Sequence, residues 1–194
     1  MVRHHRFVAV SFVLAALACA PVVLHANTIY TYTGNPFTTI IDNASTSGTY
    51  TTSMNVSVAL EFTAPLVANQ PLGPVTPVHW SFSDGRRVLN DVNSNISSHN
   101  AVQTDGSGKI QTWDLQAILA GTDDFIETSN IPFPPVGIGD SATLGCLICG
   151  TADEASSTAP GSWAITTPEP NSLILTLLGL AGLAAQKRRR AAHQ

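Results

Sequence analysis

The sequence has few basic residues outside its two ends. Between residues 27 and 166 there are twelve acidic residues and three basic ones, Arg86, Arg87 and Lys109, so this region carries a net charge of −9. The whole-chain value of −4 hides this imbalance because six of the nine lysines and arginines lie nearer the termini. A region with so few cations lacks the basic surface that nucleic acid requires. We therefore expect no nucleic-acid partner, and such an acidic surface suits a protein that is soluble outside the cell.

Histidine is also scarce, and sequence motifs for catalysis are missing. The same region contains only His79 and His99, and the chain has no Gly-x-Ser-x-Gly elbow, His-Glu-x-x-His pair or phosphate-binding loop. His79 beside Trp80 is typical of a strand, and His99 of a Ser/Asn-rich loop. Glycosidases need only two carboxylates, but no acidic pair here is marked as a site by its sequence context. We predict a protein that is not an enzyme and needs no cofactor.

Loop acids and cysteines offer few metal ligands. Asp123-Asp124 and Asp105 with Ser107 supply oxygen atoms that Ca²⁺ could use, but neither has the ordered spacing of a known calcium loop, so we expect solvated loops and no metal site. Cys146 and Cys149 lack the helix-opening context of a redox motif, and a two-Cys zinc half-site would lack its other two ligands. We expect a small local disulfide between them, since an oxidising compartment closes such pairs.

The N-terminal segment has the three parts of a secretory signal peptide. Residues 3–6 are basic or histidine, residues 7–20 are apolar but too few to span a membrane, and Leu24-His25-Ala26 ends in the small residue that signal peptidase prefers. We predict a signal peptide over residues 1–26, cleaved by signal peptidase, and a mature chain that begins at Asn27. Cys19 leaves a lipoprotein alternative open, although the leucine before it stands one place late for a lipobox.

The C-terminal segment consists of three unlike parts in a fixed order. Pro168, Glu169 and Pro170 are followed by an uncharged, mostly apolar run over residues 171–186. Four cations come next: Lys187, Arg188, Arg189 and Arg190. A helix of this run would be about 24 Å long against roughly 30 Å of hydrocarbon, so it predicts a short transmembrane helix and a weak anchor. The cations resist translocation and should stay in the cytoplasm, leaving everything upstream on the far side.

This order closely resembles the PEP-CTERM sorting signal of Gram-negative bacteria over residues 167–194. The resemblance implies that a membrane-embedded exosortase recognises Pro168, Glu169 and Pro170 and cleaves near them, while the four cations act as the stop. The body would then be released or passed toward the cell surface, often alongside exopolysaccharide production. An ordinary membrane anchor is the alternative, but it needs no Pro-Glu-Pro and usually runs closer to about 20 apolar residues.

The region between these segments favours β-structure. Four stretches alternate large apolar with small polar residues, the period-two pattern of half-buried strands. They are residues 28–33, 55–62, 79–82 and 110–115. Turn-forming residues occur at 34–36, 83–85 and 104–108. Proline-rich segments at 64–78 and 131–136 predict surface loops. A helical pattern occurs only over Asp114 to Ala120, and it is weak.

We predict an all-β domain over residues 27–166, an antiparallel β-sandwich or jelly-roll-like fold of about seven to nine short strands. Trp80, Phe82 and Trp113 are its expected core residues. Four blocks of this domain also resemble a set that recurs in PEP-CTERM proteins of uncharacterised function, at residues 30–37, 80–85, 104–113 and 160–163. That resemblance implies no activity, and the structural explanation of each block as strand, turn and packing aromatic is favoured.

These features together predict an exported cell-surface or extracellular-matrix protein that exosortase processes. Its expected partners are signal peptidase, exosortase, the inner membrane during transit, and extracellular polysaccharide bound for adhesion or a structural role in biofilm. Two alternatives stay open: a secreted carbohydrate-active enzyme and a simple membrane-anchored envelope protein. Exposed aromatic side chains in a groove would favour glycan binding, and a deep acidic cleft would favour the enzyme.

Overall fold

Twelve β-strands make up the part of the chain that the structure describes. The structure is a computed structural model, and it describes residues 27–43, 50–132, 137–146 and 149–167. The predicted signal peptide and nearly all of the predicted sorting segment lie outside these residues. Among the described residues there is no helix of sufficient length and apolar character to span a membrane.

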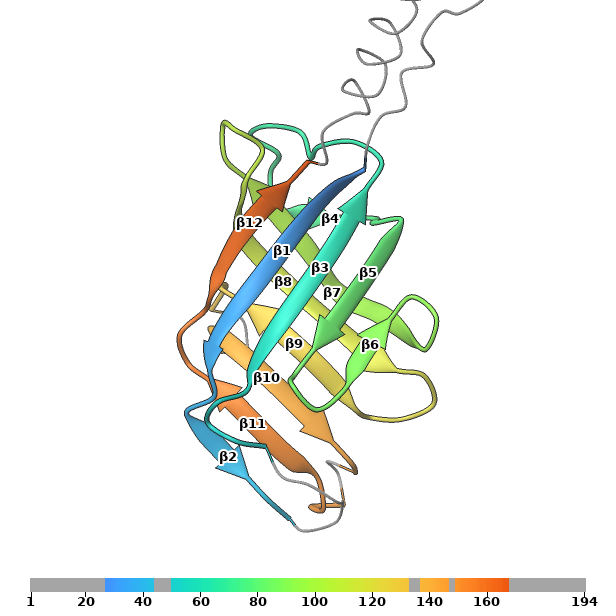
Figure 1. The fold of residues 1–194 in the computed structure, drawn as a ribbon, viewed down its shortest axis with the longest axis vertical. Helices are drawn as coiled ribbons and strands as arrows, with labels where there is room; N and C mark the ends of the chain where they lie inside the picture. The colour runs from blue at the N-terminus through green and yellow to red at the C-terminus, as the bar shows by residue number, and fades with distance from the viewer. Residues whose placement is uncertain (1–26, 44–49, 133–136, 147–148, 168–194) are drawn as a thin grey trace, which may run out of the picture. The chain divides into compact units, whose positions relative to one another are not determined.

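The strands form two antiparallel sheets. The five-stranded sheet has the order β12 (Ser162–Thr166), β1 (Thr28–Pro36), β3 (Asn55–Phe62), β5 (His79–Ser83) and β6 (Val88–Asn90). The seven-stranded sheet has the order β2 (Thr39–Ile41), β11 (Asp153–Ser157), β10 (Gly139–Leu144), β9 (Phe125–Ser129), β8 (Ile110–Leu119), β7 (Ser94–Thr104) and β4 (Gly73–Pro74). Strands β7 to β11 follow one another as a meander. Figure 1 shows the two sheets as layers whose strands cross at a steep angle.

The hydrophobic core lies between the sheets because each strand presents alternate residues to it. β3 shows this most clearly, since Val56, Val58, Leu60 and Phe62 are buried and the residues between them are partly exposed. Aromatic side chains from both sheets meet at the centre. The ring centroid of Tyr32 lies 5.5 Å from that of Trp113 and 5.3 Å from that of Trp163. The sheets therefore share a single core.

The all-β prediction is confirmed for the described residues, which form two antiparallel sheets and contain no helix. Strand β3 has the predicted bounds, and the predicted turns at 83–85 and 104–108 connect strands. The helix considered for Asp114 to Ala120 is wrong. That stretch belongs mainly to β8, which pairs with a neighbour on each side, so ladder hydrogen bonds outweigh its weak helical pattern.

Several smaller expectations need correction. The strand count exceeds the predicted range because short strands such as β2 and β4 leave little periodic signal. Gly73–Pro74 forms β4 within the predicted loop, at the sheet edge where proline is tolerated. Phe82 and Trp113 are buried as expected, but Trp80 is only partly buried and packs at the margin of the core. His99 lies in strand β7 and not in a loop.

Candidate functional site

Several acidic side chains lie in the interior of the domain and not on its surface. Asp84, Asp124 and Asp153 are buried, and two of the three basic residues of the domain pair with them. The Arg86 Nη1 atom lies 3.3 Å from Asp153 Oδ2, and the Arg87 Nη1 atom lies 2.6 Å from Asp124 Oδ2. These pairs join the β5–β6 turn of one sheet to the other sheet. Asp124 therefore forms a buried ion pair and does not lie in a solvated loop.

Asp105 also has a structural role. Its Oδ1 atom accepts hydrogen bonds from the Ser107 backbone amide at 2.8 Å, the Ser107 hydroxyl at 2.6 Å and the Lys109 backbone amide at 2.9 Å. These bonds, with the Ser107 hydroxyl contributing most, lower the pKa of the Asp105 carboxyl. The residue thus shapes the β7–β8 hairpin, as aspartate commonly does at the start of a turn.

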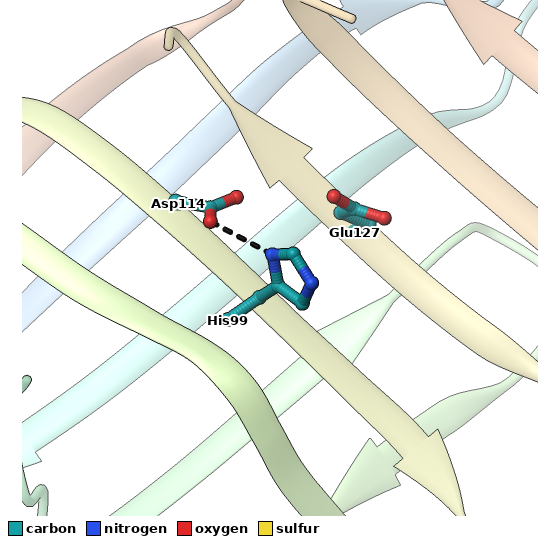
Figure 2. Close-up of side chains that lie close together, drawn as sticks. All are labelled: His99, Asp114 and Glu127. Carbon is teal, nitrogen blue, oxygen red and sulfur yellow. Dashed lines mark hydrogen bonds and ion pairs between the residues drawn. The ribbon is translucent and has the colours of Figure 1, made fainter. Parts of the chain in front are cut away.

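The outer face of the seven-stranded sheet holds a different group of polar side chains. His99 from β7, Asp114 from β8 and Glu127 from β9 lie on neighbouring strands, and one potential ligand atom from each lies within 4.8 Å of the others. In the view of Figure 2 the imidazole of His99 lies between the two carboxylates. His99 Nδ1 forms a 2.8 Å hydrogen bond with Asp114 Oδ2. We call His99, Asp114 and Glu127 the outer-face cluster.

A bulge in β7 places His99 in this cluster. Ile96 pairs with Ala117 and Asn100 with Leu115, so four steps along β7 match only two along β8. The extra residues leave the ladder, and the Ser97 hydroxyl accepts a 3.0 Å hydrogen bond from the His99 backbone amide. Bulges commonly re-aim a side chain in this way. The Ser/Asn-rich sequence that predicted a loop here corresponds to the bulge.

Glu127 is a buried carboxylate with one unsatisfied oxygen. Its Oε2 atom accepts a 3.0 Å hydrogen bond from Gln116 Nε2, whereas its Oε1 atom is buried and has no hydrogen-bond partner. Burial raises the pKa of the Glu127 carboxyl to about 7, the neighbouring Asp114 adds to this, and Gln116 and His99 act against it. A carboxyl group in such surroundings is unusual for a purely structural residue.

A hollow of about 360 Å³ lies on the same outer face, and Glu127 is part of its wall. Glu154, the half-buried ring of Phe125 and the side chain of Ile41 also line it. Four hydroxyl-bearing residues complete the polar lining: Thr39, Ser141, Thr143 and Ser156. The outer-face cluster and the hollow therefore meet at Glu127. The hollow offers hydroxyl and carboxylate groups beside a small apolar surface.

A second hollow, of about 300 Å³, lies over the five-stranded sheet. It is lined by Ser81 and Glu61 among others, and by His79 and Asp91, whose Nδ1 and Oδ2 atoms are 2.6 Å apart. The hydrogen bond to Asp91 raises the pKa of the His79 imidazole. This pair is more exposed than the outer-face cluster and has no third ligand group within the cluster distance among the described residues.

The predicted sorting and stop residues, Pro168 to Pro170 and Lys187 to Arg190, lie outside the described residues. Cys146 and Cys149 are described, and a disulfide joins them with their Cα atoms 5.2 Å apart. It closes part of the connection between β10 and β11, where the Thr151 backbone amide donates to the Cys146 carbonyl at 3.2 Å.

The outer-face cluster was missed by the sequence analysis. Its members are separated by 15 and 13 residues, and none belongs to a short motif. The available signal was alternation: Asp114 occupies a polar position of the strand predicted over residues 110–115, and Gln116, two residues further along β8, shares its face. A single sequence does not reveal the pairing register that brings Glu127 and His99 beside them.

No protein-family model matches the chain, and neither the curated proteins nor the solved structures contain a significant match to it.

Proposed function

We propose that this chain is an exported surface or matrix protein, sorted by exosortase, whose β domain associates with extracellular polysaccharide through the outer face of its seven-stranded sheet. The order of sorting motif, apolar run and basic cluster in residues 168–190 supports export and processing. A β-sandwich or jelly-roll-like scaffold, flanked by a signal peptide and a short transmembrane helix, is part of this proposal. The core shared by the two sheets supports that scaffold.

The observation that carries the binding proposal is the hollow beside Glu127. Sugars present many hydroxyl groups with small apolar faces between them, and sites for such ligands combine convergent polar groups with apolar surface. Hydroxyls from Ser141, Thr143 and Ser156 can exchange hydrogen bonds with sugar hydroxyls, and the Phe125 ring supplies apolar contact. All the aromatic residues that the structure describes are buried or half-buried, so binding here would rest on hydrogen bonds more than on stacking.

The test is a glycan-array measurement on the mature chain together with two matched variants. Ser141→Tyr places a large side chain in the hollow of the seven-stranded sheet, and Ser81→Tyr does the same in the hollow of the other sheet. We expect Ser141→Tyr to abolish binding and Ser81→Tyr to retain it. Absence of binding by the wild-type chain, or its loss only in Ser81→Tyr, would contradict the proposal.

A secreted carbohydrate-active enzyme is the second candidate, favoured by a pair of neighbouring carboxylates, Asp114 and Glu127, of which Glu127 lines the same hollow. Paired carboxylates are what glycosidases use. An incubation of the mature chain with the polysaccharides that it binds distinguishes the enzyme from the binding protein. New reducing ends are measured in this incubation. Release of reducing ends that stops in Glu127→Gln would establish the enzyme.

A further inference from the structure

We propose that the outer-face cluster binds a divalent transition metal, with Zn²⁺ as the expected ion and His99, Asp114 and Glu127 as its ligands. This site shares Glu127 with the hollow, but the metal proposal does not depend on whether the hollow binds sugar. It also departs from the sequence-based expectation of no metal site.

The spacing of the outer-face cluster suits a metal ion. The three potential ligand atoms already lie within 4.8 Å of one another, and they come from three adjacent strands. Pairing fixes the backbones of Asp114 and Glu127, and the paired residues Ile96 and Asn100 flank the bulge that carries His99. In a tetrahedral zinc site with bonds of about 2.1 Å, neighbouring ligand atoms stand roughly 3.4 Å apart. His99 Nδ1 and Asp114 Oδ2 are 2.8 Å apart, so they need to separate by only about 0.6 Å to reach this spacing. The Glu127 oxygen must in turn come closer by up to about 1.4 Å, and side-chain rotations can supply changes of this size.

Glu127 also brings an unsatisfied oxygen atom to the cluster. The residue is fully buried, and its Oε1 atom has no hydrogen-bond partner. A buried carboxylate oxygen left in this state is costly, by about 1–3 kcal/mol or more for a charged group. Gln116 holds the other oxygen, Oε2, and so orients the carboxylate while Oε1 stays available. A bound cation would satisfy Oε1 and explain why a glutamate occupies this position.

The donor set selects the metal. Ca²⁺ takes six to eight oxygen ligands and Mg²⁺ keeps most of its waters, so neither suits one imidazole and two carboxylates. Zn²⁺ accepts nitrogen and carboxylate oxygen ligands in a four-coordinate site. Three protein ligands leave one position for water. Binding requires ionised carboxylates and a coordinating imidazole nitrogen that carries no proton. If the metal binds His99 Nδ1, the proton in the hydrogen bond to Asp114 moves to Nε2 or to solvent as the metal enters.

The experiment is a calorimetric titration of the full chain, purified without a histidine tag and stripped of metal with EDTA. Zn²⁺ and Ca²⁺ are titrated separately into the wild type, His99→Ala, Glu127→Gln and His79→Ala. His79→Ala is the matched control, because it removes the other histidine of the domain, which also pairs with an aspartate. We expect wild type and His79→Ala to bind Zn²⁺ alike, and the two cluster variants to lose at least about tenfold in affinity.

Thermal unfolding gives a second readout. Zn²⁺ should raise the melting temperature of the wild type and of His79→Ala and leave that of His99→Ala unchanged, because a ligand that binds only the folded state stabilises it. His99 is partly exposed, so its replacement by alanine should not prevent folding. The proposal is overturned if His99→Ala and Glu127→Gln bind Zn²⁺ as the wild type does. It is equally overturned if the wild type binds only Ca²⁺ or no metal.

Discussion

Arg87 connects the two sheets through several contacts of a single side chain. Its Nη1 atom pairs with Asp124, its Nη2 atom donates to the carbonyl oxygens of Phe125 and Thr143, and its Nε atom lies 3.3 Å from Asp84 Oδ2. The last contact is an ion pair without a well-directed hydrogen bond. Because both aspartates are buried, the positive charge of Arg87 is what makes their burial tolerable.

Replacing Arg87 should therefore destabilise the domain strongly. Arg87→Met keeps much of the side-chain volume but leaves two buried carboxylates without their cation, and we expect a loss of about 3–5 kcal/mol in the free energy of unfolding. Lys109→Met removes an exposed cation and should change stability by no more than about 0.5 kcal/mol. Urea denaturation of both variants measures the difference. Equal stability of the two would show that Arg87 does not hold the buried charges.

Asp140 gives a pH-dependent prediction. It lies inside on β10, where the Tyr32 hydroxyl donates a 2.6 Å hydrogen bond to its Oδ1 atom and its Oδ2 atom has no partner. Burial raises the pKa of this carboxyl to about 6, although hydrogen bonds from Tyr32 and Thr128 act against the shift. Because the folded pKa is above the unfolded one, the stability contributed by the protonated acid is present below about pH 4 and is lost as the pH rises through about 6.

Asp140→Asn should remove this loss. The amide oxygen can still accept from Tyr32 but carries no charge, so the variant should gain stability relative to wild type between pH 4 and pH 7, by up to about 3 kcal/mol. Denaturant unfolding of both proteins across this range measures the difference and cancels the contribution of the other acids. A difference that stays constant with pH would show that Asp140 titrates normally.

At the scale of an element, the connection between β10 and β11 carries the Cys146–Cys149 disulfide. The cross-link joins residues only three positions apart, and so short a loop restricts the unfolded chain by about 2 kcal/mol or less. Replacing both cysteines with serine should therefore lower the free energy of unfolding slightly and leave ligand binding intact. Chemical denaturation checks the first expectation. Protein taken from the periplasm should resist alkylation, and two freely alkylated thiols would contradict the disulfide.

At the scale of the whole molecule, strand β12 ends two residues before the predicted sorting motif. β12 pairs with β1 over five residues, and Trp163 in it is buried against Tyr32. Cleavage near Pro168 would thus leave the last strand of the domain in place. Cleavage before Ser162 would remove Trp163 from the core. The position of the motif is compatible with release of a folded domain.

The two parts of the tail should fail differently when changed. Replacing Pro168, Glu169 and Pro170 with alanine leaves the apolar run and the cations, so we expect insertion without processing and accumulation in the membrane. Neutralising Lys187 to Arg190 removes roughly 1 kcal/mol of leaflet attraction per cation together with the barrier to translocating charge, so retention should fail before cleavage. Fractionation and immunoblotting measure both outcomes. Identical behaviour of the two variants would show that the tail is a simple membrane anchor.

The sequence by itself determined the features that depend on neighbouring residues. Alternation predicted β3 over residues 55–62, and the glycine and aspartate signals at 83–85 and 104–108 predicted two turns, because side-chain direction and backbone φ are local properties. The all-β class followed from such patterns. The charge imbalance was likewise readable, but not which acids would be buried.

Only the tertiary structure decided which distant residues meet. The sequence predicts that Asp124 lies in a solvated loop. The packing of the two sheets instead places Arg87 against it. His99, Asp114 and Glu127 come together because β7, β8 and β9 pair in one register and a bulge turns His99 toward β8. Alternation fixes the face on which each side chain lies, but a register is a relation between strands, and shifting it by one residue would send a whole row to the other face.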